Sequence, residues 1–240
     1  MDLLIDIGNT NLKWAPCQAR RLGPVAKLSH REGLGALWDA WRDTPTPDRV
    51  LVANVAGADL EAKLAPIVRG RWGLEPGLLR TQAEAHGVTV AYPDPSRLGV
   101  DRWLTLIAVR HFHSTPALVV DCGTAMTLDA IDAQGRHLGG MIAPGLGLMR
   151  HSLFAGTRIP AVSQMDFRGL LGQDTAECVA AGTLHALAGL VVRVQVGLRA
   201  ERGWEPQVLL CGSDAALLAG LFEFQTTQVS DLVLQGLSVF

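Results

Sequence analysis

Two short segments of the chain combine a carboxylate, a glycine and a hydroxyl in the same order. Asp6 to Thr10 reads DIGNT after an apolar run, and Asp121 to Thr124 reads DCGT after another. A glycine in a turn between strands lets backbone N–H groups approach an anion closely, and the threonine hydroxyls add donors. The carboxylates can hold the cation, or the water of the cation, that neutralises a phosphate. Two copies of this pattern predict a site for adjacent phosphates of one nucleotide.

The sequence lacks the other common phosphate-binding motifs. No G-x-x-x-x-G-K-[ST] pattern occurs in it, which argues against a P-loop. The glycines Gly145 and Gly147 have no third glycine at the required spacing and do not follow the first strand of a βαβ unit, so they support dinucleotide binding only weakly.

The elements that must position the two segments repeat along the chain. Leu3 to Ile7 and Asn11 to Cys17 are expected to form a hairpin, and the segment from Ala117 to Ile131 matches it strand for strand. This similarity indicates an internal duplication, with halves at residues 1–114 and 115–240. Apolar spacing predicts the remaining helices over 33–43, 58–69, 100–111 and about 175–201, and the remaining strands over 49–55, 139–143 and 207–210.

Composition is that of a folded, water-soluble protein. Of the 240 residues, 48% are hydrophobic and 18% charged, and the net charge of -2 gives no sign of a disordered tail or of a chain whose main partner is nucleic acid. The four cysteines are far apart, so neither a zinc site nor a disulfide scaffold is expected.

The N-terminus lacks the positive region of a signal peptide. The most apolar stretch, from Cys178 to Val192, is shorter than a membrane span and contains His185, which favours a core or subunit-interface helix. We therefore expect a cytoplasmic protein without a membrane partner.

Four motifs occur together in one order: Asp6 to Thr10 (DIGNT), Leu98 to Trp103 (LGVDRW), Asp121 to Ala125 (DCGTA) and Gly139 to Gly145 (GGMIAPG). This combination resembles the type III pantothenate kinases of the actin, sugar-kinase and Hsp70 superfamily. The resemblance implies an α/β fold of duplicated actin-like (ribonuclease H-like) domains, with mixed sheets flanked by helices and the active site in the interdomain cleft. It also implies ATP-dependent phosphorylation of pantothenate to 4'-phosphopantothenate, the first step of coenzyme A synthesis, by a homodimer whose second subunit completes the pantothenate pocket.

The resemblance also assigns roles to individual residues. Asp101 is implied as the base that accepts the proton of the attacking hydroxyl. Mg²⁺ is implied near Asp6, through water, and a monovalent cation, K⁺ or NH₄⁺, at Asp121. The implied ATP-binding residues are Asp6, Ile7, Gly8, Asn9, Thr10, Asn11, Leu12, Lys13, Gly123, Thr124 and Gly212. The implied pantothenate-binding residues are Tyr92, Gly99, Val100, Asp101, Arg102 and Thr175, with Arg102 paired to the substrate carboxylate.

Four of these assignments have a plainer alternative. Asp101 and Thr175 stand where helix caps are common, Lys13 could be solvated on an edge strand, and Tyr92 could anchor a loop. The turn at Gly212 departs from the family's Thr-Gly-Gly pattern, which predicts poor nucleotide affinity. The histidines lack metal-ligand spacing and are expected on the surface or in the core.

Three functional alternatives also stay open. Another acceptor, such as a sugar or acetate, would predict no dependence on Arg102, since a neutral sugar has nothing to pair with it. Some proteins of this family were first described as accessory factors for transcriptional regulation, but the sequence shows neither a basic surface nor a helix-turn-helix. A non-catalytic binding protein would be expected to have lost Asp101 or Asp6, and both are present.

Overall fold

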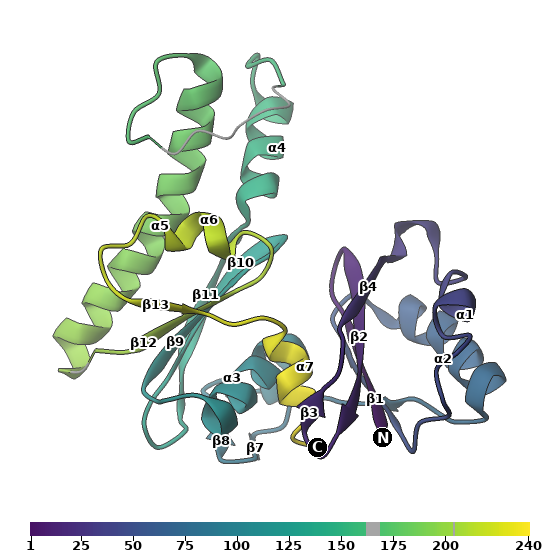
Figure 1. The fold of residues 1–240 in the computed structure, drawn as a ribbon. Coiled ribbons are helices and arrows are strands. Elements are labelled where there is room, and N and C mark those ends of the chain that lie inside the picture. The colour runs from purple at the N-terminus through teal and green to yellow at the C-terminus, as the bar shows by residue number, and fades with distance from the viewer. Residues whose placement is uncertain (162–168, 204) are drawn as a thin grey trace. The chain divides into compact units, whose positions relative to one another are not determined.

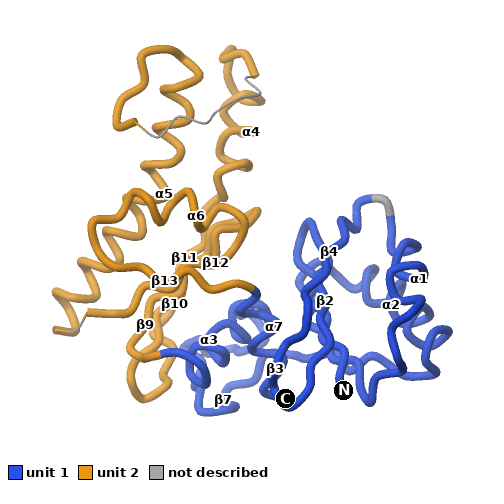
Figure 2. Tube along the Cα trace, viewed as in Figure 1, with its two compact units in different colours: residues 1–113, 231–240 blue, residues 114–230 orange. Residues whose placement is uncertain are grey.

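The computed structural model describes residues 1–161, 169–203 and 205–240 and is shown in Figure 1. The chain forms two compact units: residues 1–113 together with 231–240, and residues 114–230 (Figure 2). The last ten residues, which we expected in the second half, therefore belong to the first unit. Their short apolar helix packs on a helix of that unit, which explains the difference.

The first unit is built on a mixed sheet in the order β3-β2-β1-β5-β6, with β4 also paired to β2. β2 runs antiparallel to β1, whereas β5 and β6 continue in parallel beside it. A separate two-stranded sheet is made by β7 and β8. The strands are β1 Asp2–Ile7, β2 Asn11–Gln18, β3 Arg21–Leu22, β4 Ala26–Ser29, β5 Val50–Asn54, β6 Gly77–Leu78, β7 Glu84–Ala85 and β8 Val88–Thr89.

Helices cover both faces of this sheet (Figure 1). The helices are α1 Leu37–Ala40, α2 Ala58–Trp72, α3 Val100–Phe112 and α7 Leu232–Leu237, with 3-10 turns η1 His30–Glu32 and η2 Pro95–Arg97. Alternate β1 residues, Leu3, Ile5 and Ile7, join the apolar core with α1 and α2. On the other face α7 contacts β1 and β5 and packs closely on α3.

One predicted helix of the first unit is much shorter than expected. We predicted a helix over residues 33–43, but α1 comprises only Leu37–Ala40. Gly33 has a φ of 97°, in the region that favours glycine, and so cannot belong to a right-handed helix. The predicted helices at 58–69 and 100–111 are present as α2 and α3.

The second unit repeats the plan of the first. Its sheet has the order β11-β10-β9-β12-β13, with β10 antiparallel and β12 parallel to β9. β9 thus has the neighbours that β1 has, a hairpin partner on one side and a parallel strand on the other. The elements are β9 Ala117–Cys122, β10 Ala125–Ile131, β11 His137–Pro144, α4 Leu146–Gly156, α5 Thr175–Arg202, β12 Gln207–Cys211, α6 Ala215–Ala219 and β13 Thr226–Gln228. This equivalence supports the predicted duplication.

Helix α5 contains the most apolar stretch of the sequence. At 28 residues it is long enough, and apolar enough, to cross a membrane, so our expectation of a shorter segment was wrong. Half of its most apolar 18-residue window is buried inside the protein, and Leu184, Leu187 and Val191 lie in the core with strands β9, β10 and β12. Core helices of soluble proteins have these same properties.

Candidate active site

The first predicted phosphate turn joins β1 and β2. Ile7 and Leu12 are the last paired residues, so the turn comprises residues 8–11. Its ends are closed by the Gly8 N–H, which donates to the Asn11 carbonyl at 3.0 Å. The carbonyl of Gly8 lies 2.8 Å from Nε2 of His30, on the 3-10 turn that follows β4. Two hydrogen bonds therefore fix the conformation of this turn.

Asp6 and Lys13 lie directly opposite one another on β1 and β2, so their side chains share one face of the sheet. The Lys13 ammonium also lies 3.0 Å from Asp231, the residue that precedes α7. Because β2 has partners on both sides, the alternative of a solvated lysine on an edge strand is wrong. The Lys13 side chain is 35% exposed. Its role toward a phosphate stays a prediction.

The second predicted phosphate turn joins β9 and β10 and is one residue shorter, with residues 123–125 between Cys122 and Met126. The Thr124 carbonyl accepts a hydrogen bond of 3.0 Å from the N–H of Gly145. A Cβ atom on Gly145 would lie 2.1 Å from the Gly123 carbonyl oxygen, so only glycine allows this approach. The GG-x-I-x-PG motif thus supports the turn through its last glycine.

Gly212 lies close to Asp121 and Cys122 at the end of β9, and its role toward ATP stays a prediction. It has a φ of 89°, and a Cβ atom there would be 2.5 Å from Oδ1 of Asp121. The next carboxylate, Asp214, donates its backbone N–H to the Cys122 carbonyl at 3.1 Å. Our sequence analysis missed Asp214, whose only signal was its position two residues after Gly212.

Burial dominates the electrostatics around this second turn. It raises the pKa of the Cys122 thiol to about 12, with smaller contributions from Asp121 and Asp214. Burial also raises the pKa of Asp214, while Arg150 and a hydrogen bond from Ser213 oppose the shift. The pKa of the Arg150 guanidinium is lowered by its own burial. The Cys122 thiol is therefore protonated at neutral pH and is not a nucleophile.

The predicted substrate motif opens helix α3. Gly99 is the N-cap, and the Asp101 carboxylate accepts a hydrogen bond of 2.7 Å from the backbone N–H of Arg102. A Cβ atom on Gly99 would lie 2.5 Å from Oδ1 of Asp101. The lack of a side chain at Gly99 therefore makes room for the carboxylate. The Val100 side chain is buried, which leaves its backbone for any contact with a ligand.

Arg102 and Tyr92 meet in the first unit, although ten positions separate them. Nη1 of Arg102 donates to the Tyr92 hydroxyl at 3.2 Å, and the guanidinium carbon lies 5.9 Å from the centre of the ring. Arg102 is only 6% exposed. Burial of a guanidinium is costly unless hydrogen bonds or charges compensate for it, so this arginine is held by its surroundings in a defined orientation.

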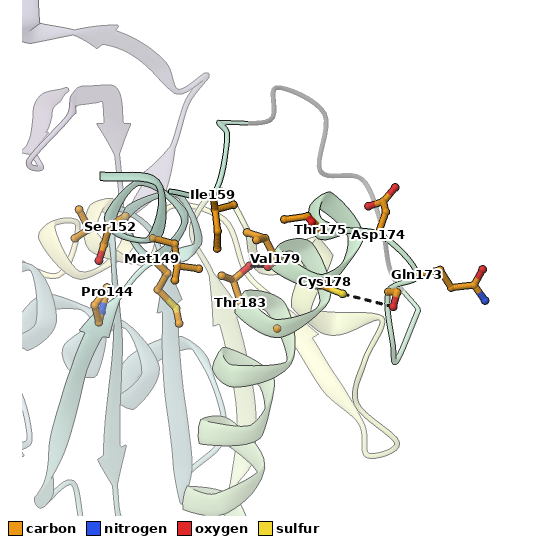
Figure 3. Close-up of a pocket in the computed structure, with 14 residues that line it drawn as sticks. Pro144, Met149, Ser152, Ile159, Gln173, Asp174, Thr175, Cys178, Val179 and Thr183 are labelled. Carbon is orange, nitrogen blue, oxygen red and sulfur yellow. Dashed lines mark hydrogen bonds between the residues drawn. The ribbon is translucent and has the colours of Figure 1, made fainter. Parts of the chain in front are cut away.

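Thr175 belongs to the second unit, at the first turn of α5. The cap of this helix is Asp174, whose side chain accepts the N–H of Glu177 at 2.8 Å, so the alternative of a capping threonine is wrong. Thr175 instead lines a cavity of about 870 Å³ between α4 and α5 (Figure 3). Leu148 and Val179 make much of its wall apolar, and Thr183 adds a further hydroxyl.

The carboxylates proposed for cations are single rather than clustered. Within residues 1–161, 169–203 and 205–240, no group of three or more His, Cys, Asp or Glu side chains could hold a metal ion. Mg²⁺ in nucleotide sites is bound by one or two carboxylates together with phosphate oxygens and water. A single carboxylate such as Asp6 is therefore compatible with the predicted Mg²⁺, and the predicted role of Asp121 toward a monovalent cation stays a prediction.

Four histidines lie on the surface or in the core, or contact neighbouring residues, as the sequence predicted for the histidines. His137 is buried, with Nε2 2.9 Å from Asp129, and His111 contacts the His86 carbonyl at 3.1 Å. His113 lies 3.3 Å from Gln235 on α7, and His151 is exposed on α4. His30 does contact the first predicted phosphate turn, through the Gly8 carbonyl. Nothing in the sequence around His30 indicated this contact.

Comparison with known proteins identifies the family. A family model for type III pantothenate kinase matches residues 2–196. The chain belongs to the type III pantothenate kinase family. It is similar to a type III pantothenate kinase from Nitrosococcus oceani, with 33% identity over 99% of this chain and 92% of the relative. For the one from Laribacter hongkongensis, identity is 37% over 99% of this chain and 97% of the relative.

A solved structure of lower sequence identity has the same fold. A putative 2-dehydro-3-deoxygalactonokinase from Sinorhizobium meliloti superposes with a TM-score of 0.64 at 18% identity, covering 100% of this chain and 97% of that one. The predicted α/β fold of duplicated actin-like halves is thereby confirmed. Of the residues predicted for the site, Tyr92 and Asp101 lie in the first unit, and Asp121 and Thr175 lie in the second.

Proposed function

We propose that this protein transfers the γ-phosphoryl group of ATP to pantothenate, which yields 4'-phosphopantothenate, the first intermediate of coenzyme A synthesis. Membership in the type III pantothenate kinase family supports the activity. The structural observation that carries it is the buried Arg102, oriented by Tyr92, one residue after Asp101. A fixed guanidinium suits a planar carboxylate such as that of pantothenate, and a neighbouring carboxylate suits a proton acceptor.

ATP binds, in this proposal, at the two related turns. The first turn supplies Asp6, Ile7, Gly8, Asn9, Thr10, Asn11, Leu12 and Lys13, and the second supplies Gly123 and Thr124, with Gly212 beside it. Backbone N–H groups and threonine hydroxyls bind phosphate oxygens, and Lys13 adds a positive charge. Mg²⁺ near Asp6 neutralises phosphate charge when it is bound, and Asp121 takes a monovalent cation, K⁺ or NH₄⁺.

Pantothenate lies against Tyr92, Gly99, Val100, Arg102 and Thr175. Arg102 binds its carboxylate, and the Thr175 hydroxyl donates to the polyol or amide portion. The Asp101 carboxylate accepts the proton of the attacking hydroxyl as the new oxygen–phosphorus bond forms and ADP leaves. Catalysis is then mostly orientation and charge neutralisation, since the phosphoryl group needs no covalent intermediate.

We also propose that the protein is a cytoplasmic homodimer. Its four cysteines are free, three of them buried, as expected in a reducing compartment. Helix α5 exposes Val192 and Val196, one turn apart, and β11 exposes Met141 and Ile142. We assign the face of α5 that carries the neighbouring pair Val192 and Val196 to the subunit interface.

The decisive experiment is an assay of pantothenate phosphorylation with Mg·ATP, with and without K⁺ or NH₄⁺. Asp101→Asn should lower kcat by about 10²- to 10⁴-fold, as expected for loss of a general base. Arg102→Lys should raise KM for pantothenate by about tenfold or more, because an ammonium cannot form the same paired hydrogen bonds. No product with either salt, or no dependence on Arg102, would favour a different acceptor such as a neutral sugar.

A further inference from the structure

The contact between His30 and the first phosphate turn has a consequence for nucleotide binding. His30 begins the 3-10 turn η1, directly after β4, and β4 pairs with β2 where the phosphate turn ends. Ser29 is the register partner of Asn11, so His30 is held next to the turn by sheet pairing. Its Nε2 lies 2.8 Å from the Gly8 carbonyl oxygen. A carbonyl oxygen only accepts hydrogen bonds, so Nε2 must carry the proton.

This hydrogen bond fixes the orientation of one peptide group. In a trans peptide the carbonyl and the following N–H point in opposite directions. With the Gly8 carbonyl directed at His30, the Asn9 N–H points to the opposite side of the turn. The Gly8 N–H is already donated to Asn11, so it cannot turn toward a ligand without opening the hairpin.

Glycine makes such a restraint necessary. A side chain would limit the backbone angles at position 8, but glycine permits many orientations of the peptide that follows it. A Cβ atom on Gly8 would meet only the Asn11 carbonyl oxygen, at 3.5 Å, so crowding does not restrict it either. If this peptide turned over, the Gly8 carbonyl would face the phosphate in place of an N–H.

The second phosphate turn has a corresponding restraint. There the Thr124 carbonyl is bound by the backbone N–H of Gly145, at 3.0 Å. In both turns a donor from a neighbouring element holds a turn carbonyl. The first turn differs in using a side chain, which can be replaced without changing the backbone.

We infer that His30 is a positioning residue of the ATP site, holding the Gly8–Asn9 peptide so that the Asn9 N–H donates to a phosphate oxygen. The inference rests on the proposed binding of ATP by residues 6–13. His30 acts through the backbone and does not touch the reacting atoms.

Three histidine variants test the role by kinetics. His30→Ala should raise KM for ATP by about five- to tenfold, the effect of losing one well-oriented hydrogen bond, and leave KM for pantothenate within about twofold. His30→Gln, which keeps an N–H donor of similar reach, should recover most of the ATP affinity. The matched control is His111→Ala, which removes another histidine from a backbone carbonyl in the same unit and should leave both constants unchanged.

Two results would overturn the inference. One is an unchanged KM for ATP in His30→Ala, and the other is a His30→Gln variant as impaired as the alanine variant. Asp6→Asn separates this failure from failure of the ATP site itself. If Asp6→Asn weakens ATP binding and His30→Ala does not, only the role of His30 is wrong. If neither does, the proposed ATP site is wrong.

A measurement that does not use the alanine variant covers the case in which His30→Ala does not fold. Nitrogen-15 NMR of the histidine rings at about pH 8, where an ordinary histidine is neutral, distinguishes the two tautomers. The His30 signals, assigned from their loss in His30→Gln, should show the proton on Nε2. A proton on Nδ1 would contradict the hydrogen bond to Gly8 and with it the inference.

Discussion

At the scale of single residues, glycines make room for the carboxylates of the proposed site. Gly99 lies against Asp101 in the first unit, and Gly212 lies against Asp121 in the second. In each case an added Cβ atom would be 2.5 Å from a carboxylate oxygen. A distance below about 3 Å forces one of the two groups to move. These glycines therefore determine where the carboxylates lie.

Gly99→Ala should impair catalysis with little loss of stability. Gly99 has φ −53° and ψ 135°, which any residue can adopt, so alanine adds no backbone strain. The methyl group must displace the Asp101 carboxylate, and kcat should fall by roughly 10- to 100-fold. The free energy of unfolding should change by about 1 kcal/mol or less. Steady-state kinetics and urea denaturation measure the two effects.

Gly35→Ala is the matched control for this substitution. Gly35 lies in the same unit, and an added Cβ atom there would have no neighbour within 4 Å. The kcat of Gly35→Ala should equal that of the wild type. Equal activity in Gly99→Ala and Gly35→Ala would show that the position of Asp101 does not depend on Gly99.

The raised pKa of the Cys122 thiol predicts that the folded protein loses stability at alkaline pH. Its pKa in the folded protein is about 12, against an ordinary value near 9, because it is buried. Above about pH 9 the unfolded chain releases this proton and the folded protein keeps it, so stability falls until the pH passes the folded pKa. Between these limits the free energy of unfolding should fall by about 1.4 kcal/mol per pH unit more than in Cys122→Ala.

Denaturant titrations of both proteins at several pH values test this difference. The stability advantage of the wild type over Cys122→Ala should be constant below about pH 9 and shrink above it. Other ionising groups are common to the two proteins and cancel. A constant difference across the alkaline range would mean that the folded thiol ionises normally.

The sequence allowed us to predict site residues that lie together in short motifs, but not residues that reach the predicted turns only through folding. Gly99, Asp101 and Arg102 are almost consecutive, so their common location follows from one helix start. His30 and Asp214 reach the phosphate turns only through strand pairing and a turn after β12. Nothing in the types of residues around them indicates those contacts.

At the scale of elements, the strands and helices with strong periodicity were predicted and the short ones were not. Both hairpins, α2, α3 and β12 are close to the expected bounds. The predicted helix over 33–43 was too long because backbone conformation at glycine depends on context. The strands β3, β6, β7 and β8 have two residues each and carry no periodicity. Helix α7 was missed because six residues are too few for a helical pattern.

Helix α7 should nevertheless be important for the stability of the first unit. Its residue Gly236 packs so closely on α3 that an added Cβ atom would be 2.1 Å from the Leu104 carbonyl oxygen. Gly236→Ala should lower the free energy of unfolding by about 2 to 4 kcal/mol, since two backbones must separate. Alanine is a better helix former than glycine by about 1 kcal/mol, so helix propensity alone would stabilise Gly236→Ala. A measured loss of stability would therefore come from the close contact between α7 and α3.

Gly189→Ala provides the comparison for this substitution. Gly189 lies within α5, and an added Cβ atom there would meet nothing within 4 Å. Urea denaturation should show unchanged or higher stability for Gly189→Ala and a clear loss for Gly236→Ala. Similar stability of the two variants would contradict the close packing of α7 on α3.

At the scale of the whole molecule, duplication was the most reliable inference from sequence. The repeated D-x-G segments predicted two equivalent hairpins, and the strand orders of the two sheets agree with this. The return of the C-terminal residues to the first unit was not predictable. It depends on which apolar surface α7 covers, which a pattern of apolar residues does not specify.

A charge introduced on the exposed face of α5 tests the proposed homodimer. Val192 and Val196 are 40% and 52% exposed on one face of this helix. Val196→Glu places a charge on that face. Burying the charge without a partner costs several kcal/mol, so the variant should be monomeric where the wild type is dimeric. Sedimentation velocity measures the two masses.

Val25→Glu is the control, because Val25 is an exposed valine of the first unit, 39% exposed, outside this surface. It should remain dimeric. A monomeric wild type would refute the dimer, whereas a dimeric Val196→Glu would exclude this face of α5 as the interface. If Val196→Glu is monomeric and its KM for pantothenate rises more than its KM for ATP, the second subunit contributes to the pantothenate pocket. Unchanged constants in a monomer would mean that each chain contains a complete site.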